Sequence, residues 1–308
     1  MKRNLLNAGG TILVVLLMIG SGRAQTRQPM PPAAAPPASP APSGQMPSGQ
    51  LPSGQIPAAG QPGAQTAPAV PAVNKPEEDD YKAFYEAAGP DPTTQIQLGE
   101  AFVKNYPASR YLATVYSRLA LDYLNSGPDD TDKMFAAAQQ SIDLDPDEVD
   151  ALSLEVWAMA RKVNAQDPGA ADEFVKLENY GNHAITLISA MTKPASMDDA
   201  QFTAAKNDKL SMCYSGLGVI DFKMGKADEA VTELSQATQL ANSPDPVDYF
   251  ILGHAYEAVS RFEDAVDAFS KCNTAGPLQD RCQAGLNDAK KRALLAPAPT
   301  PPPASPKS

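Results

Sequence analysis

The stretch KADEAVTEL at residues 226–234 is followed 35 residues later by RFEDAVDAF at residues 261–269. Both stretches have two acidic residues, then an alanine at the fifth position and a large apolar residue at the ninth. The residues before them agree as well, since Tyr214, Leu217 and Gly218 correspond to Tyr249, Leu252 and Gly253. A match over so many positions at one fixed spacing indicates an internal repeat.

The matched positions have steric reasons to agree. Apolar residues recur at helical spacing on both sides of a short turn, so each repeat is expected to be a pair of antiparallel helices. The glycine of the first helix and the alanine of the second lie where the pair crosses, because only small side chains allow a close approach. A single hairpin cannot bury its own apolar face, so neighbouring hairpins must stack.

The repeat resembles the tetratricopeptide repeat family. The residues with that family's order and spacing are Tyr249, Leu252, Gly253, Tyr256, Ala265, Phe269 and Pro277. The repeat here has one residue more than the family's unit, Asp221 replaces the usual Tyr, and Cys272 replaces the usual Ala. The match is specific for residues 211–244 and 246–279, fair for 109–146, and loose for 77–107. Residues 149–191 are longer than a repeat in their turn and second helix.

The apolar spacing predicts helices near 77–88, 91–105, 109–125, 131–144, 148–163, 168–191, 198–224, 226–241, 246–259, 261–274 and 278–294. No run alternates with period two over enough length to predict a sheet. The resemblance implies an all-α fold, a right-handed α-solenoid of about five helical hairpins over residues 76–295. The single last helix is expected to cap the final hairpin.

The N-terminus has the features of an export signal. Lys2 and Arg3 precede the short apolar run Thr11–Gly20, and small residues surround a cleavage position after Ala24. The apolar run is shorter than the roughly 20 residues of a membrane span. We therefore expect a signal peptide at 1–24, a mature protein in the periplasm or cell envelope or secreted, and no stable membrane span after cleavage. The alternative is an uncleaved anchor.

Two proline-rich segments flank the repeats. Residues 25–75 consist almost entirely of Pro, Ala, Gln, Gly and Ser and include PSGQM, PSGQL and PSGQI at 42–56. Residues 296–308 have a similar composition. Such segments bury too little apolar surface to form a core, so both are expected to be disordered. The first is interpreted as a linker, with the Met, Leu and Ile of its three copies as alternative docking points for a partner.

The charge distribution argues against nucleic acid as a partner. All 36 acidic residues follow residue 76, whereas five of the 25 basic residues precede it, so residues 76–308 have a net charge of −16. Phosphate backbones and anionic lipid surfaces would be repelled by such a body. No feature of the sequence fixes an oligomeric state.

No motif for an enzyme, a cofactor or a metal occurs. The chain has only two histidines, His183 and His254, far apart in the sequence, and it lacks a phosphate-binding loop or a nucleophile elbow. Carboxylate pairs such as Asp145 and Asp147 lie at turns and helix starts, where capping explains them. We expect a protein that is not an enzyme and binds no cofactor; a site built by 149–191 is the enzymatic alternative.

The three cysteines have different expected roles. Cys213 lies inside a helix and is interpreted as a buried small apolar residue. Cys272 and Cys282 flank the turn before the last helix, so a disulfide in an oxidising compartment would hold that helix on the last repeat. The alternative is that both are reduced.

The resemblance also implies a concave groove lined by the first helix of each hairpin. In the family's register its residues are Leu121, Leu124, Asn125, Trp157, Met212, Ser215, Val219, Phe222, Lys223, Val247, Phe250, His254 and Glu257. His254 is then a partly exposed groove residue, not a catalytic base, and Glu263 and Asp264 suit the start of a helix. Few of these residues are charged, which favours a peptide held by apolar contacts. The alternative is ordinary helix packing in a different register.

The sequence leaves two candidate functions. The first is an exported scaffold that binds a protein or peptide segment in the groove. The second is a structural or assembly factor of the cell envelope whose proline-rich tails make the key contacts while the repeats act as a spacer.

Overall fold

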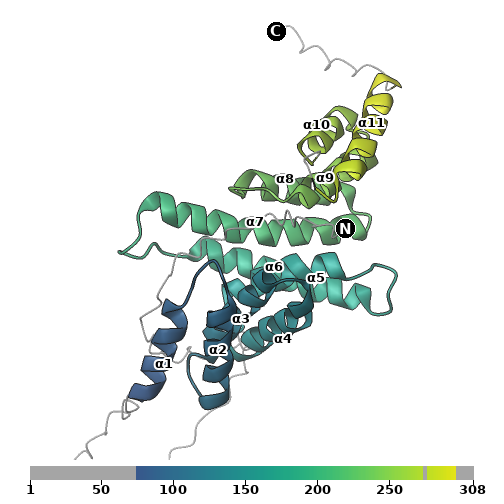
Figure 1. Cartoon of the computed structure of the whole chain (residues 1–308). Coiled ribbons are helices and arrows are strands. Elements are labelled where there is room, and N and C mark those ends of the chain that lie inside the picture. Colours follow the sequence, from purple (N-terminus) through teal and green to yellow (C-terminus); the bar gives the residue numbers. More distant parts are fainter. Residues whose placement is uncertain (1–73, 273–275, 296–308) are drawn as a thin grey trace, which may run out of the picture. The chain divides into compact units, whose positions relative to one another are not determined.

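The computed structural model describes residues 74–272 and 276–295, and within them it contains helices and no strand (Figure 1). The α-helices are α1 (Lys75–Glu86), α2 (Thr93–Asn105), α3 (Leu112–Ser126), α4 (Thr131–Leu144), α5 (Val149–Lys162), α6 (Ala170–Ala190), α7 (Asp199–Lys223), α8 (Ala227–Leu240), α9 (Pro246–Ala258), α10 (Phe262–Cys272) and α11 (Gln279–Leu295). A 3-10 turn, η1 (Pro128–Asp130), precedes α4. The all-α prediction is confirmed. The expected signal peptide, the tail at 296–308 and all but the end of the linker lie outside the described residues.

Several helices begin where the sequence supplies a cap. The Asp198 side chain accepts the backbone N–H of Gln201, whose own side chain completes a capping box at the start of α7. Asp245 accepts the N–H of Val247 at the start of α9, and Pro246 occupies the first turn. These local signals position the first helices of the last two complete hairpins.

The turns inside those two hairpins have the same geometry. Gly225 follows α7 with φ +78°, and Ser260 follows α9 with φ +61°. Lys226 donates its N–H to the carbonyl of Asp221 at 2.8 Å, and Arg261 donates to Tyr256 at 2.8 Å. Because equivalent residues make equivalent bonds, the repeat found in the sequence is also a structural repeat.

The glycines of these hairpins lie at helix crossings. A Cβ added to Gly218 would come within 2.6 Å of the Leu234 side chain, and one added to Gly253 would come within 2.7 Å of the Phe269 ring. The alanines of the second helices, Ala230 and Ala265, are fully buried. The close approach predicted at the two glycines is thus confirmed.

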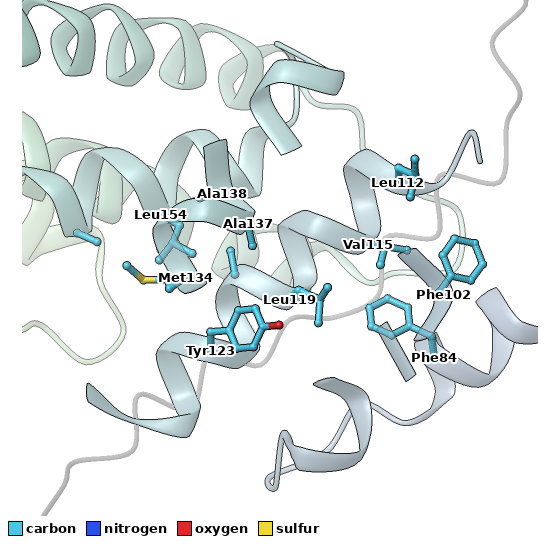
Figure 2. Close-up of a cluster of buried hydrophobic side chains, with 12 residues drawn as sticks. Phe84, Phe102, Leu112, Val115, Leu119, Tyr123, Met134, Ala137, Ala138 and Leu154 are labelled. Atoms are coloured by element: carbon cyan, nitrogen blue, oxygen red, sulfur yellow. The ribbon is translucent and has the colours of Figure 1, made fainter. Parts of the chain in front are cut away.

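The core continues from one hairpin to the next. Phe84 and Phe102 from the first hairpin face Val115 and Leu119 of α3, and the same cluster includes Leu154 of α5 (Figure 2). Further clusters join α4–α7, α5–α10 and α9–α11. This continuity is the stacking that hairpins with one apolar face require.

The middle hairpins depart from the regular unit. α6 has 21 residues and α7 has 25, whereas α8 has 14 and α10 has 11.

Among the described residues, no helix combines the length and the apolar character needed to cross a membrane.

Candidate functional site

The first helices of successive hairpins are α3, α5, α7 and α9, with α11 in the next place. We call the side of these helices that carries the predicted groove residues the first-helix face. The structure divides this face into three parts with different accessibility.

The first part lies on α3 and α5. Leu121 and Leu124 are half-buried, and Asn125 is exposed at the end of α3. Leu124 and Trp157 are partly buried hydrophobic residues that pack against the N-terminal core cluster, as does Met212 of α7. This part of the face is therefore half-buried, with Asn125 exposed at its edge.

The second part is closed, which corrects the prediction for two residues. Ser215 and Val219 are each only 1% exposed, so they present no surface to a partner. The reason is Gly216, where a Cβ would lie 2.6 Å from the backbone oxygen of Val156. α5 approaches α7 so closely at this glycine that its neighbours are covered. We call the contact of Val156 with Gly216 and its neighbours the closed middle.

Lys223 closes the face further along the same pair of helices. Its Nζ donates to the carbonyl oxygens of Ala160 and Val163 at 2.6 Å and of Arg161 at 3.2 Å. These carbonyls belong to the last turn and end of α5, where intrahelical donors are missing. Burial, followed by the charge of Arg161, lowers the pKa of Lys223. The side chain acts as a helix cap and not as a free cation.

Arg161 links three first helices, and the sequence did not predict this role. Its Nη2 donates to Asp248 Oδ1 of α9 at 2.7 Å and to Ser215 Oγ of α7 at 2.7 Å, and its guanidinium lies 4.5 Å from the centre of the Trp157 ring. Burial raises the pKa of Asp248 to about 6, although Arg161 opposes this shift. Because 87 residues separate the ion pair, no local pattern predicts it. The sequence feature that comes nearest to predicting this close approach of first helices is Gly216, a second small residue two positions before Gly218.

The third part, which we call the aromatic end, consists of Phe250, His254, Glu257 and Arg281. The Phe250 and His254 rings meet edge to face at 4.7 Å, and His254 also meets the buried Phe269 at 4.9 Å. His254 Nδ1 lies 3.0 Å from Glu257 Oε2, and the His254 side chain is 37% exposed. Phe250 and Val247 are half-buried. This end of the face keeps aromatic side chains accessible.

Arg281 joins the aromatic end from α11, a helix that the sequence predicts only as a cap. Its guanidinium carbon lies 4.7 Å from the centre of the Phe250 ring. The neighbouring Cys282 forms a disulfide with Cys272, with an S–S distance of 2.06 Å. The cap thus also contributes a cation to the first-helix face.

Phe222 borders a shallow hollow between the closed middle and the turn after α5. The hollow has a volume of about 460 Å³. Its lining residues are Arg161, Lys162, Val163, Asn164, Ala165, Gln166, Phe222 and Lys223. Phe222, Val163 and Ala165 supply its apolar surface, and the ammonium of Lys223 is already bonded to carbonyls.

Burial strongly changes the pKa of several enclosed groups. Burial raises the pKa of Asp122 and of Glu155 to about 7, yet both residues are 2% exposed. Burial also raises the pKa of the Cys213 thiol to about 11, and this cysteine is free.

Within residues 74–272 and 276–295, no three His, Cys, Asp or Glu side chains gather as a metal site would require. His183 lies on α6, away from His254 on α9, and its Nε2 is 2.8 Å from Asp147 Oδ1.

The comparison with known proteins gives structural neighbours only. No family model matches the sequence, and none of the curated proteins matches it. A thermophilic tetratricopeptide repeat protein of Thermus thermophilus is 15% identical, covers 70% of this chain and 99% of its own, and has a TM-score of 0.37. An assembly chaperone of RpL4 is 12% identical, covers 72% of this chain and 98% of its own, and has a TM-score of 0.38. A tetratricopeptide repeat protein of Parabacteroides merdae is 12% identical, covers 70% of this chain and 100% of its own, and has a TM-score of 0.29.

The chain resembles tetratricopeptide repeat proteins in its fold. The features that carry this resemblance are the two equivalent turns after α7 and α9 and the glycine crossings at Gly218 and Gly253. Of the expected groove residues, Asn125 is exposed, Ser215 and Val219 are buried, and the others, which include Phe222, Phe250 and His254, are half-buried.

Proposed function

We propose that this protein is an exported, non-enzymatic scaffold that binds a segment of a partner protein at the aromatic end of its first-helix face. The observation that carries the proposal is the contrast in accessibility along that face. Ser215 and Val219 are buried, whereas Phe250 and His254 remain partly exposed.

Apolar contacts would supply most of the binding free energy. Aromatic side chains bury a large area and dominate interface energetics when they lie near the centre of the contact. Phe250 has its ring fixed by His254 and Arg281, so little conformational entropy is lost when a partner covers it. An extended or helical segment that places an apolar side chain on this ring is the occupant we propose.

Export and tethering are the other parts of the proposal. Residues 1–24 would direct export and be removed, and residues 25–75 would act as a flexible tether between the repeats and the chain's N-terminus. The mass of the protein isolated from its native envelope tests this. A mature chain that begins at Gln25 agrees with the proposal, and retention of Met1 contradicts cleavage.

The binding function is tested by affinity capture from the native envelope with the full mature chain as bait. Phe250→Ala should abolish capture of a partner without changing the far-UV circular dichroism spectrum, and Phe222→Ala tests whether the bound segment also reaches the hollow beside Phe222. Phe135→Ala is the matched control, because Phe135 is a half-buried phenylalanine on the second helix α4. Capture that survives Phe250→Ala contradicts the proposal.

Deletion of residues 25–75 separates the two functions. The scaffold proposal expects capture to continue without the linker. If deletion abolishes capture while Phe250→Ala has no effect, the proline-rich tails make the key contacts and the repeats are a spacer.

A further inference from the structure

The arginines of the repeat body show a consistent pattern. Residues 74–272 and 276–295 contain six arginines, and five of them form an ion pair with a carboxylate. These pairs are Arg110–Glu78 at 2.6 Å, Arg118–Asp122 at 3.4 Å, Arg161–Asp248 at 2.7 Å, Arg261–Asp264 at 2.7 Å and Arg292–Asp288 at 2.6 Å. Within the same residues, Arg281 is the one arginine that lacks such a pair.

Three of the paired arginines also lie over an aromatic ring. The guanidinium of Arg110 is 4.7 Å from the Tyr111 ring centre, that of Arg161 is 4.5 Å from Trp157, and that of Arg261 is 4.6 Å from Tyr256. In each case the planar guanidinium contacts the ring while one of its nitrogens binds a carboxylate. A ring-stacked arginine in this protein therefore comes with a carboxylate partner.

Arg281 has the ring contact without the carboxylate. Its guanidinium lies 4.7 Å from the Phe250 ring, the same distance as for Arg110 and Tyr111. The ring is held by its edge-to-face contact with His254, and the disulfide of Cys282 fixes the first turn of α11. The N–H donors of an exposed guanidinium are thus oriented in advance, on a face with accessible apolar surface.

We propose that Arg281 and Phe250 form a recognition site for an acidic side chain of the bound partner segment. The Asp or Glu carboxylate pairs with the Arg281 guanidinium, and an adjacent apolar residue packs on the Phe250 ring. Residues 76–308 have a net charge of −16, which repels an acidic run, so the segment carries a single carboxylate among apolar neighbours. This inference rests on the proposed function and names the chemistry of its ligand.

The test uses the full mature chain and immobilised octapeptides of Ala and Leu with one Glu at each position in turn. Matched peptides carry Gln or Lys in place of the Glu. Wild-type protein should bind the best Glu peptide about tenfold more tightly than its Gln counterpart, which corresponds to about 1.4 kcal/mol. Arg281→Gln should remove this preference, and Arg281→Lys should remove most of it, because an ammonium cannot reproduce the planar, ring-stacked fork.

Lys290→Gln is the matched control, since Lys290 is an exposed cation on the same helix without a ring contact. It should retain the tenfold preference. Peptides that bind without a preference for Glu, or an Arg281→Gln variant that keeps the preference, overturn the inference while the scaffold function stands. Failure of every peptide to bind, Glu and Gln alike, also overturns the inference, and the capture experiment with Phe250→Ala then decides the scaffold function separately.

Discussion

The closed middle and the aromatic end show two ways in which neighbouring first helices can meet. α5 and α7 meet through Gly216, so the backbone of Val156 reaches the space that a side chain would occupy. α9 and α11 meet through side chains, with the Arg281 guanidinium stacked on the Phe250 ring. A single glycine thus converts an expected binding groove into core, whereas a pair of large side chains keeps the face accessible.

The basic side chains of these two regions also differ in whether they have partners within the protein. Next to the closed middle, Arg161 and Lys223 direct their donors to Ser215, Asp248 and the end of α5. At the aromatic end, Arg281 has no carboxylate partner among the described residues. The same residue types therefore stabilise the fold in one region and remain available for binding in the other.

The largest expected effect comes from the residue on which the aromatic end is built. Phe269 is fully buried, and both Gly253 and Gly285 lie against its ring. Phe269→Ala should lower the free energy of unfolding by about 3–5 kcal/mol, because it leaves a cavity between α9, α10 and α11. Urea denaturation followed by circular dichroism measures this. The control Phe262→Ala, at the half-buried start of α10, should cost less than about 1 kcal/mol, and equal costs would contradict the packing described.

Next to the closed middle, Arg161→Met breaks the ion pair that joins α5 to α9 and leaves Asp248 buried without its cation. At pH 8 we expect a loss of about 2–3 kcal/mol, below the usual cost of breaking a buried pair because Arg161 is 19% exposed. The raised pKa of Asp248 means that the folded state holds a proton that the unfolded state releases between pH 3.8 and about 6. The uncompensated charge, and with it most of the cost, should therefore disappear as the pH falls below 6.

Urea denaturation of wild type and Arg161→Met at pH 8 and pH 5 checks this prediction. Arg261→Met is the control, because its partner Asp264 is exposed; it should change stability by less than about 0.5 kcal/mol at both pH values. An Arg161→Met cost that is the same at pH 8 and pH 5 would show that Asp248 does not depend on this cation.

Removal of the disulfide tests the stability of the aromatic end separately from that of the closed middle. Cys272 and Cys282 are ten residues apart, so replacing both with serine should cost about 2 kcal/mol, slightly less than a longer loop would. Amide hydrogen exchange should accelerate in α10 and α11 and stay unchanged in α5 and α7. Labelling of thiols before reduction should detect Cys213 alone in the unfolded protein; three labelled thiols would refute the bridge.

The smallest expected effect concerns the two equivalent turns. Ser260 has φ +61°, a conformation that costs a non-glycine residue about 1 kcal/mol, and the matching residue of the preceding repeat is Gly225. Ser260→Gly should raise stability by about 0.5–1 kcal/mol, and Gly225→Ser should lower it by a similar amount. Thermal unfolding of the two variants measures this, and a destabilised Ser260→Gly protein would contradict the equivalence of the turns.

The sequence was sufficient to predict the helices and the packing inside the regular hairpins. Those features depend on local spacing: Gly218 and Gly253 are 35 residues apart, and so are the turn residues Gly225 and Ser260. The nearness of Cys272 and Cys282 was predictable for the same reason, because they flank one short turn.

The accessible part of the face was not predictable in the same way. The family's register assigns Ser215 and Val219 to the groove, but their burial depends on the distance between α5 and α7, which Gly216 sets. The Arg161–Asp248 pair joins residues 87 positions apart, and Arg281 comes from a helix outside the repeat unit. Such contacts follow from how hairpins stack, and no single hairpin contains them.

The most direct measurement is site-specific photo-crosslinking in cells that produce the protein. The photoreactive residue p-benzoylphenylalanine is placed at His254 in one protein and at Thr232, an exposed position on the second helix α8, in another. Light should produce a covalent adduct of higher mass from position 254 and none from position 232. An adduct from position 232 alone, or from neither position, would contradict binding at the aromatic end of the first-helix face.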